Sequence, residues 1–436
     1  PSSHSSSSSS SPSPPPLKLR IAVFVRKWPS GSTPGGLERH AYTLHHFLAE
    51  RGHEVHVFTG PGNFSSSHSH HGSLIVHPHP PNSSNYNPTT AWWAFVAANA
   101  TTPFDVVHTE SVALHHTYAA QVPNVVASWH GIAFEVVHSN IVSELLRPAN
   151  ESRSPELQRT LSERLLKVSS EIRFFGNYRH HIAISDYVGE VLRTIYEIPA
   201  GNVHVILSGV DGAIFRPSAE RGAAFRREVG IMDEEAVVLG VAGRLVKDKG
   251  HPLLIEVLEK MMMVGEEGGV QEESECKARV LIAGDGPWAV RYRELAPCVK
   301  VLGSMLPAQL AAFYNAIDVF LNPTLRAQGL DLTLLEAMMS GKPVLATRFA
   351  SITRSVVREG SGVGYTFSPN AASLRVELER VVAEGRVALA EKGEAAFLQA
   401  TRAFTSAKMG LSYERLFLCL THARFCHYPL PHVDSS

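Results

Sequence analysis

The second half of the chain alternates between short apolar runs and amphipathic patterns, and this alternation constrains the fold more than any other feature. The apolar runs have the length of buried strands, and most are followed by a segment with helical spacing. Such an order implies right-handed crossovers and a doubly wound parallel α/β sheet. Strands are predicted near 237–243, 278–284, 299–303, 318–322, 343–347 and 362–367, with helices near 251–264, 287–296, 307–316, 332–340 and 351–358.

The first half predicts a second α/β unit that opens with a βαβ arrangement. An apolar strand within 17–25 leads through Gly35-Gly36 into a helical pattern that ends at Gly52, and a strand follows at 54–59. A Gly-Gly turn lets the backbone approach a ligand closely. Because the pattern is not G-x-G-x-x-G, it does not indicate a dinucleotide site.

Later segments of this half carry two histidines where parallel strands are expected to end. His108 follows the apolar run 104–108, and His130 follows the run 124–129. Open α/β sheets bind ligands at the carboxyl ends of their strands, although a lone histidine is more often structural, as we expect for His108. We interpret 60–90 as a polar loop.

Length and charge limit the classes of function. A chain of 436 residues is too long for one ordinary core and suggests two domains. Its formal net charge of −1 gives no electrostatic argument for binding nucleic acid or an anionic membrane, and no apolar run reaches the length of a membrane span.

Three further features bear on the cellular compartment. The Ser/Pro-rich residues 1–16 are expected to be a disordered tail, or the stem left by an upstream segment. Four N-x-[ST] sequons, at Asn63, Asn82, Asn99 and Asn150, weakly favour a secretory lumen. The four cysteines show no C-x-x-C spacing, which argues against a zinc site or a redox pair and predicts small buried hydrophobes.

A loop between a predicted strand and a predicted helix offers an anion site. The stretch NPTLRAQGLDLTLLEAMMSGKPVLAT begins at Asn322, and its helix starts near Leu332. Backbone N–H groups at a helix start favour a phosphate or sugar oxygen. Gln328 and Glu336 frame this point, although Thr333 to Glu336 also fits a capping box, in which Glu336 would only bond the backbone.

A basic loop after the first strand of the second half could neutralise a diphosphate. In GRLVKDKG, which starts at Gly243, Arg244 and Lys249 flank a loop that enters a helix, whereas Lys247 is expected to be a solvated charge.

Together these motifs resemble the retaining glycosyltransferases of family 4. LEAMMSGKPV is similar to the segment that carries the family's second donor-site glutamate, here Glu336, and GRLVKDKG to the family's G-R-x-x-x-x-K-G clamp. SWHG resembles the family's sugar-contacting histidine, here His130. Gln328 replaces the family's first acid, and Asp331 stands where a second glycine is usual.

The resemblance implies a GT-B architecture, in which two Rossmann-like domains face each other across a cleft. It divides the chain into a tail (1–16), an acceptor-side domain (17–208), a linker (209–218), a nucleotide-sugar-binding domain (219–405), a helix that crosses back (406–425) and a second tail (426–436).

The resemblance further implies transfer of a sugar from a UDP- or GDP-sugar with retention of configuration. The acceptor, a glycan, lipid or small molecule, is not indicated. No cofactor and no metal are expected, because Arg244 and Lys249 could balance the diphosphate charge. The implied catalytic residues are Arg244, Lys249, Glu336, His130 and Gln328, and the implied donor-binding residues are Gly36, Gly243, Arg244, Lys249, Met305, Gly329, Leu330, Asp331, Leu332 and Glu336.

Two competing hypotheses follow from the same residues. The substitutions at Gln328 and Asp331 also fit a protein that binds a nucleotide sugar or glycan without turnover. A Rossmann oxidoreductase is disfavoured, because the glycine fingerprint and its acidic ribose ligand are missing. The expected location is the Golgi or a secretory lumen if a membrane anchor precedes the chain, and the cytoplasm otherwise.

Overall fold

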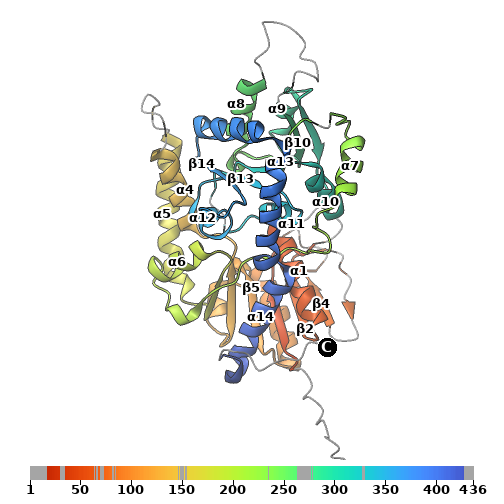
Figure 1. Ribbon diagram of the computed structural model, residues 1–436. Coiled ribbons are helices and arrows are strands. Elements are labelled where there is room, and N and C mark those ends of the chain that lie inside the picture. The colour runs from red at the N-terminus through yellow and green to blue at the C-terminus, as the bar shows by residue number, and fades with distance from the viewer. Residues whose placement is uncertain are drawn as a thin grey trace, which may run out of the picture.

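The computed structural model shows two parallel α/β domains, one above the other in Figure 1. It describes residues 17–29, 35–62, 64, 67–68, 73–80, 83, 85–145, 147, 152, 155–233, 235–262, 276, 278–326 and 329–426. The predicted α/β fold class with two Rossmann-like units is confirmed.

The first domain is an eight-stranded sheet in the order β3-β4-β2-β1-β5-β6-β7-β8, parallel except for the β3–β4 pair. Central strands are buried on both faces, as expected when helices cover a parallel sheet. The strands are β1 (Arg20–Phe24), β2 (Glu54–Thr59), β3 (Ser67–His68), β4 (Ser73–Pro78), β5 (Val106–Glu110), β6 (Val125–Trp129), β7 (His180–Ala183) and β8 (Val203–Val205).

One expectation for this half was wrong. The segment interpreted as a polar loop, 60–90, contains β4, which pairs with β2 and buries Leu74 and Val76. Polar neighbours hid this short strand. The helices and 3-10 turns are α1 (Gly36–Glu50), α2 (Pro88–Thr101), η1 (Ser111–Ala113), α3 (His116–Ala119), α4 (Ala133–Leu145), α5 (Pro155–Phe175), α6 (Asp186–Thr194) and η2 (Ala200–Asn202).

The second domain follows the predicted alternation, and its six strands are all parallel in the order β11-β10-β9-β12-β13-β14. The strands are β9 (Val238–Ala242), β10 (Arg279–Ala283), β11 (Val299–Gly303), β12 (Val319–Asn322), β13 (Val344–Thr347) and β14 (Gly364–Phe367). The helices and turns are α7 (Ala219–Glu228), η3 (Lys247–Lys249), α8 (His251–Met262), α9 (Ala289–Arg293), α10 (Pro307–Ala316), α11 (Leu332–Met339), α12 (Ala350–Ser355), α13 (Ala371–Ala403), α14 (Ser406–Thr421) and η5 (Ala423–Phe425).

The chain passes between the domains twice, at adjacent places. Val210 donates its N–H to the carbonyl of Phe404 at 2.8 Å and accepts from the N–H of Ser406 at 2.9 Å. Helix α14, dark blue in Figure 1, then lies among the first-domain elements, where Met409, Tyr413 and Phe417 are buried in the core around β1. The last helix therefore completes the first domain.

The cysteines were interpreted wrongly. Cys276 bonds to Cys298 and Cys419 to Cys426, and of the four only Cys298 is buried. Spacings of 22 and 7 residues gave no signal, because the fold and not a local motif brings each pair together.

The sequons and the absence of an apolar membrane span were the other sequence features that concerned the cellular compartment. Asn99 lies in α2, where its side chain accepts a hydrogen bond from the N–H of Phe104 at 2.9 Å, and the other three sequon asparagines fall outside the described residues. In the described part of the chain, none of the helices combines the length and apolarity that crossing a bilayer requires.

Candidate functional site

A cleft of about 720 Å³ lies between the domains, at the carboxyl ends of strands from both sheets. This is where doubly wound sheets bind ligands. Helix α1 lines one side through Gly36, Arg39 and His40. The predicted site residues that line the cleft are Gly36, His130, Gly243, Arg244, Lys249, Met305, Leu330, Asp331 and Leu332.

Arg244 follows β9 at a turn that needs glycine. Gly243 has a φ of +127°, which only glycine adopts readily, and the backbone then turns Arg244 into the cleft. The Arg244 side chain is exposed, and across the described residues no ion pair or hydrogen bond holds its guanidinium. Arg244 thus offers a full positive charge to a ligand.

Lys249 is held by an acidic partner from the neighbouring loop. Its Nζ lies 2.7 Å from Oδ2 of Asp331, and both side chains are mostly buried. Burial alone would raise the pKa of Asp331, but Lys249 and hydrogen bonds from Asn322 and Thr333 hold that pKa well below its usual range. Asp331 is therefore ionised, and it neutralises Lys249 inside the cleft.

The capping-box interpretation of Glu336 was wrong. Asp331 is the N-cap of α11 and accepts from the N–H of Thr333, a short polar side chain being the usual cap. Glu336 lies five residues further along and faces the other domain. Its Oε1 is 2.7 Å from Nη1 of Arg39, and its Oε2 accepts from the hydroxyl of Tyr314 at 2.9 Å.

The predicted glycines have different surroundings. A Cβ at Gly36, the first residue of α1, would meet nothing within 4 Å, so this position is open towards a ligand. A Cβ at Gly329 would lie 2.6 Å from Cγ1 of Ile184, so this glycine allows the loop to pass against the first domain. Gln328 lies outside the described residues.

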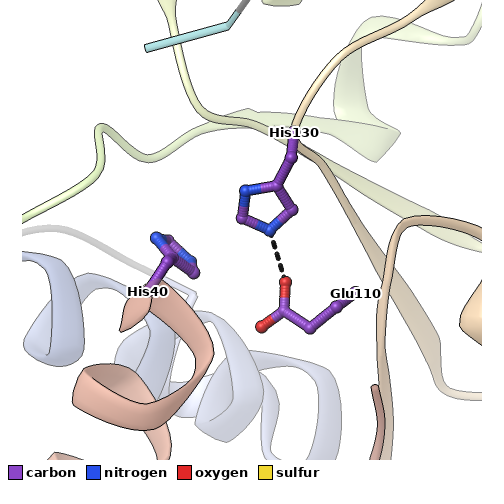
Figure 2. A group of neighbouring side chains, drawn as sticks. All are labelled: His40, Glu110 and His130. Carbon is purple, nitrogen blue, oxygen red and sulfur yellow. Dashed lines mark hydrogen bonds and ion pairs between the residues drawn. The ribbon is translucent and has the colours of Figure 1, made fainter. Parts of the chain in front are cut away.

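His130 belongs to a cluster that Figure 2 shows, with side chains from α1, β5 and the loop after β6 pointing toward one another. Nε2 of His130 donates to Oε2 of Glu110 at 2.5 Å. Burial acts to raise the pKa of Glu110, but nearby His108, His130 and His40 bring it well below the ordinary value. Glu110 therefore fixes the ring orientation of His130 and leaves Nδ1 free of this bond.

The same cluster contains the side chains that could hold a metal. Ligand atoms of His40, Glu110 and His130 lie within 4.8 Å of one another, as do those of His45, His108 and Glu110. Nε2 of His40 and Oε1 of Glu110 are buried and lack a hydrogen-bond partner among the described residues.

His108 is structural, as expected for a lone histidine. Nδ1 of His45 donates to the carbonyl of Ala41, so in neutral His45 Nε2 must accept from Nδ1 of His108. Nε2 of His108 then accepts from Ser128, whose oxygen in turn accepts from the hydroxyl of Tyr413. This chain of hydrogen bonds ties α14 to the sheet.

We expect the buried histidines to make the protein acid-sensitive. Burial lowers the pKa of His40 and of His108 to about 3 and that of His181 to about 4, from an ordinary 6.5. Between the folded and the unfolded pKa of each histidine, the unfolded chain binds more protons than the folded protein. The free energy of unfolding therefore decreases as the pH is lowered, by at most about 1.4 kcal/mol per pH unit for each histidine. Buried Glu135, whose pKa is raised to about 7, partly offsets the loss. Urea midpoints at pH 7, 6 and 5 test this, and unchanged midpoints would contradict it.

Asp331→Asn should separate binding from turnover. Asparagine keeps the helix cap but removes the charge that positions Lys249. We expect tighter binding of a nucleoside diphosphate, because Lys249 is no longer neutralised, and at least about tenfold slower turnover, because its ammonium is no longer positioned. Calorimetry and a donor-hydrolysis assay measure the two effects. Gln328→Ala is the comparison and should be milder; the reverse order would refute the role given to Asp331.

Three residues of this site were missed from the sequence. Arg39 and Tyr314 enclose Glu336 from α1 and α10, and Glu110 orients His130. Only Glu110 had a local signal, because it follows His108 by two residues at the end of a strand. Nothing in the spacing of Arg39 or Tyr314 indicates their shared partner.

Each of the two domains matches a known protein family in sequence. Residues 34–213 match the model described as Glycosyltransferase Family 4, and residues 236–384 match that of Glycosyl transferases group 1. Similar curated proteins include an uncharacterized glycosyltransferase of Methanocaldococcus jannaschii, 26% identical over 47% of this chain and 50% of its own length. A D-inositol 3-phosphate glycosyltransferase of Corynebacterium kroppenstedtii is 28% identical over 38% of each chain. The chain spans about half the length, or less, of these relatives.

Solved structures share the fold across nearly the whole chain. Sucrose-phosphate synthase from Thermosynechococcus elongatus has a TM-score of 0.70 at 20% identity, covering 93% of this chain and 100% of its own. Anabaena HepE in complex with UDP-glucose has a TM-score of 0.64 at 17% identity, covering 91% and 99%. The two domains and their order thus agree with the GT-B fold, and the chain belongs to the family 4 / group 1 glycosyltransferases, its first domain matching Glycosyltransferase Family 4 and its second the group 1 glycosyl transferases.

Proposed function

We propose that the protein transfers a sugar from a nucleoside-diphosphate sugar to an acceptor hydroxyl, with retention of configuration and without a divalent ion. The observation that carries the proposal is the exposed guanidinium of Arg244 in the interdomain cleft, beside Lys249 and the amino end of α11. A departing diphosphate needs fixed positive charge, and these groups supply it.

The chemistry requires little else from the protein. The bond between the sugar carbon and the diphosphate breaks, and the acceptor oxygen bonds to that carbon on the same face. The departing phosphate oxygen takes the acceptor's proton, so no side chain acts as nucleophile. His130, oriented by Glu110, would contact the sugar, and Glu336 would accept hydrogen bonds from the ribose hydroxyls.

A UDP-sugar is the donor that we propose to test first. HepE, which shares the fold, was solved with UDP-glucose. Arabidopsis thaliana starch synthase IV, with a TM-score of 0.65 at 14% identity, was solved with ADP and acarbose, so other bases belong in the panel.

Incubation with radiolabelled UDP-, GDP- and ADP-sugars, followed by separation of free sugar, tests the proposal. Water can take the place of the acceptor hydroxyl, so slow release of free sugar from one member of the panel is expected. Arg244→Ala controls for contaminating hydrolases. If no donor is hydrolysed or bound, the proposal fails.

A second candidate is binding without turnover. Gln328 replaces an acid of the family, and both oxygens of Glu336 are engaged by protein groups. Tight donor binding with no hydrolysis and no transfer would favour it. A large gain of activity in Gln328→Glu would favour it as well, because the parent would then lack an essential charge.

Activity should survive EDTA. Arg244 and the backbone N–H groups at the amino end of α11 offer positive charge of the kind that a divalent ion provides in other transferases. Donor hydrolysis is measured before and after incubation with EDTA, with added magnesium or manganese as the comparison. Loss of activity that a metal restores would contradict the expectation and direct attention to the ligand atoms of His40, Glu110 and His130.

The disulfides support a location in an oxidising compartment. Such bonds persist in secretory and similar environments and are rare in the cytosol. Mass spectrometry of the protein from its native source, alkylated before reduction, should find Cys276–Cys298 and Cys419–Cys426 as linked peptides. Four alkylated cysteines would contradict this location.

A further inference from the structure

Arg39 lies between the cleft and the carboxylate of Glu336, to which the family resemblance gives a donor-binding role. Its Nη1 is 2.7 Å from Oε1 of Glu336. The Arg39 side chain is 17% exposed and lines the cleft, whereas that of Glu336 is 2% exposed and is absent from the lining. A ribose can therefore reach Glu336 only if Arg39 moves.

The pair also joins the two domains. Arg39 is in the first turns of α1, and Glu336 is in α11 of the second domain, where Tyr314 holds its other oxygen. Separating a mostly buried ion pair without replacement leaves unbalanced charge, which is strongly unfavourable. Anything that separates this pair must offer new partners to both members.

The charges in the cleft indicate what those partners are. The diphosphate of a nucleotide sugar carries two negative charges. Arg244 has no protein partner among the described residues, but Asp331 neutralises Lys249 at 2.7 Å. Arg326, which also lines the cleft, pairs with Asp248. Among the described lining residues, the second domain thus supplies one uncompensated cation for two anionic phosphates. Nε of Arg39 is buried and lacks a hydrogen-bond partner, so its guanidinium is incompletely used in the pair with Glu336.

We propose that Arg39 is a donor-binding residue that exchanges partners. When a nucleoside diphosphate enters, the ribose hydroxyls donate to Glu336, and Arg39 turns to the phosphates as the second uncompensated cation. The inference rests on the proposed function. It adds that the acceptor-side domain contributes a charged side chain to the donor site, and that donor binding replaces an ion pair between the domains.

Affinity for a nucleoside diphosphate relative to its nucleoside tests the exchange. Calorimetry first identifies the tightest of UDP, GDP and ADP for the unmodified protein. Binding of that compound and of its nucleoside is then measured with Arg39→Gln. Losing a phosphate contact should weaken the diphosphate at least about tenfold, as expected for a charge-assisted contact, while nucleoside affinity stays equal or rises because Glu336 is uncovered.

Two further variants make the result specific. Arg39→Lys keeps the charge and should retain most of the preference for the diphosphate, which guards against a simple folding defect. Arg26→Gln removes an exposed cation of the same domain that is not among the residues lining the cleft, and should leave the affinity ratio nearly unchanged.

Each outcome is decisive. If diphosphate and nucleoside both bind more tightly to Arg39→Gln, Arg39 is only a cover over Glu336, and the exchange is wrong. If the ratio of affinities does not change, Arg39 is a structural tie between domains, and the exchange is again wrong, although the proposed function stands. If the unmodified protein binds none of the three diphosphates, the proposed function fails and the exchange fails with it.

Discussion

Arg244→Ala should slow donor turnover by about thirtyfold to a thousandfold, which corresponds to about 2–4 kcal/mol of transition-state stabilisation. Negative charge develops on the diphosphate as the sugar departs, and Arg244 is a cation of the second domain that lines the cleft and that no described protein group neutralises. Because its side chain is exposed and unpaired within the described chain, its removal should leave the free energy of unfolding nearly unchanged. Donor hydrolysis and a urea melt measure the two quantities.

Lys247→Ala is the matched control for this prediction. Lys247 lies in the same loop and is exposed, but it is not among the residues that line the cleft. It should change turnover by less than about threefold. Lys249→Ala should also slow donor turnover. Because it leaves the buried Asp331 without its partner, it should lower the free energy of unfolding as well. Full turnover in both Arg244→Ala and Lys249→Ala would refute the diphosphate assignment.

Phe417→Ala should destabilise the first domain by about 3–5 kcal/mol. Phe417 is fully buried in the core around β1, although it is more than 300 residues away in sequence. Truncating it leaves a cavity between α14 and the sheet. Four of the five tryptophans, at 28, 92, 93 and 129, belong to the first domain, so tryptophan fluorescence in urea reports its unfolding.

Leu411→Ala on the same helix is the comparison. Its side chain is 47% exposed, so its truncation should change the free energy of unfolding by less than about 0.5 kcal/mol. Equal midpoints for Phe417→Ala and Leu411→Ala would show that α14 does not stabilise the first domain.

The fold could be predicted from the sequence because the spacing of apolar residues that distinguishes strands from helices is a local property of the chain. Each strand of the second domain is a short apolar run, and most are followed by a helical pattern, so the α/β order can be seen without tertiary information. Strand β4 could not be recognised in this way, because its exposed positions and polar flanks resemble a loop until β2 provides hydrogen-bonding partners.

Most of the segments that line the cleft could also be predicted from local features of the sequence. Arg244, Lys249 and Asp331 lie at strand ends and helix starts, where backbone geometry directs side chains towards a ligand, so their segments could be identified by spacing. Their pairing could not, because Lys249 and Asp331 are 82 positions apart and meet only when β9 and β12 are neighbours.

Tertiary structure alone decided the state of the carboxylates. The local pattern allowed Glu336 to cap its own helix, and the family resemblance implied that it binds a ribose; in the structure it pairs with Arg39 and Tyr314. It also joined each cysteine to a partner. The physical reason is the same in both cases. Local pattern determines which face of an element is apolar and where the element ends, whereas a buried charge or thiol takes whichever partner the packing of distant elements brings within bonding distance.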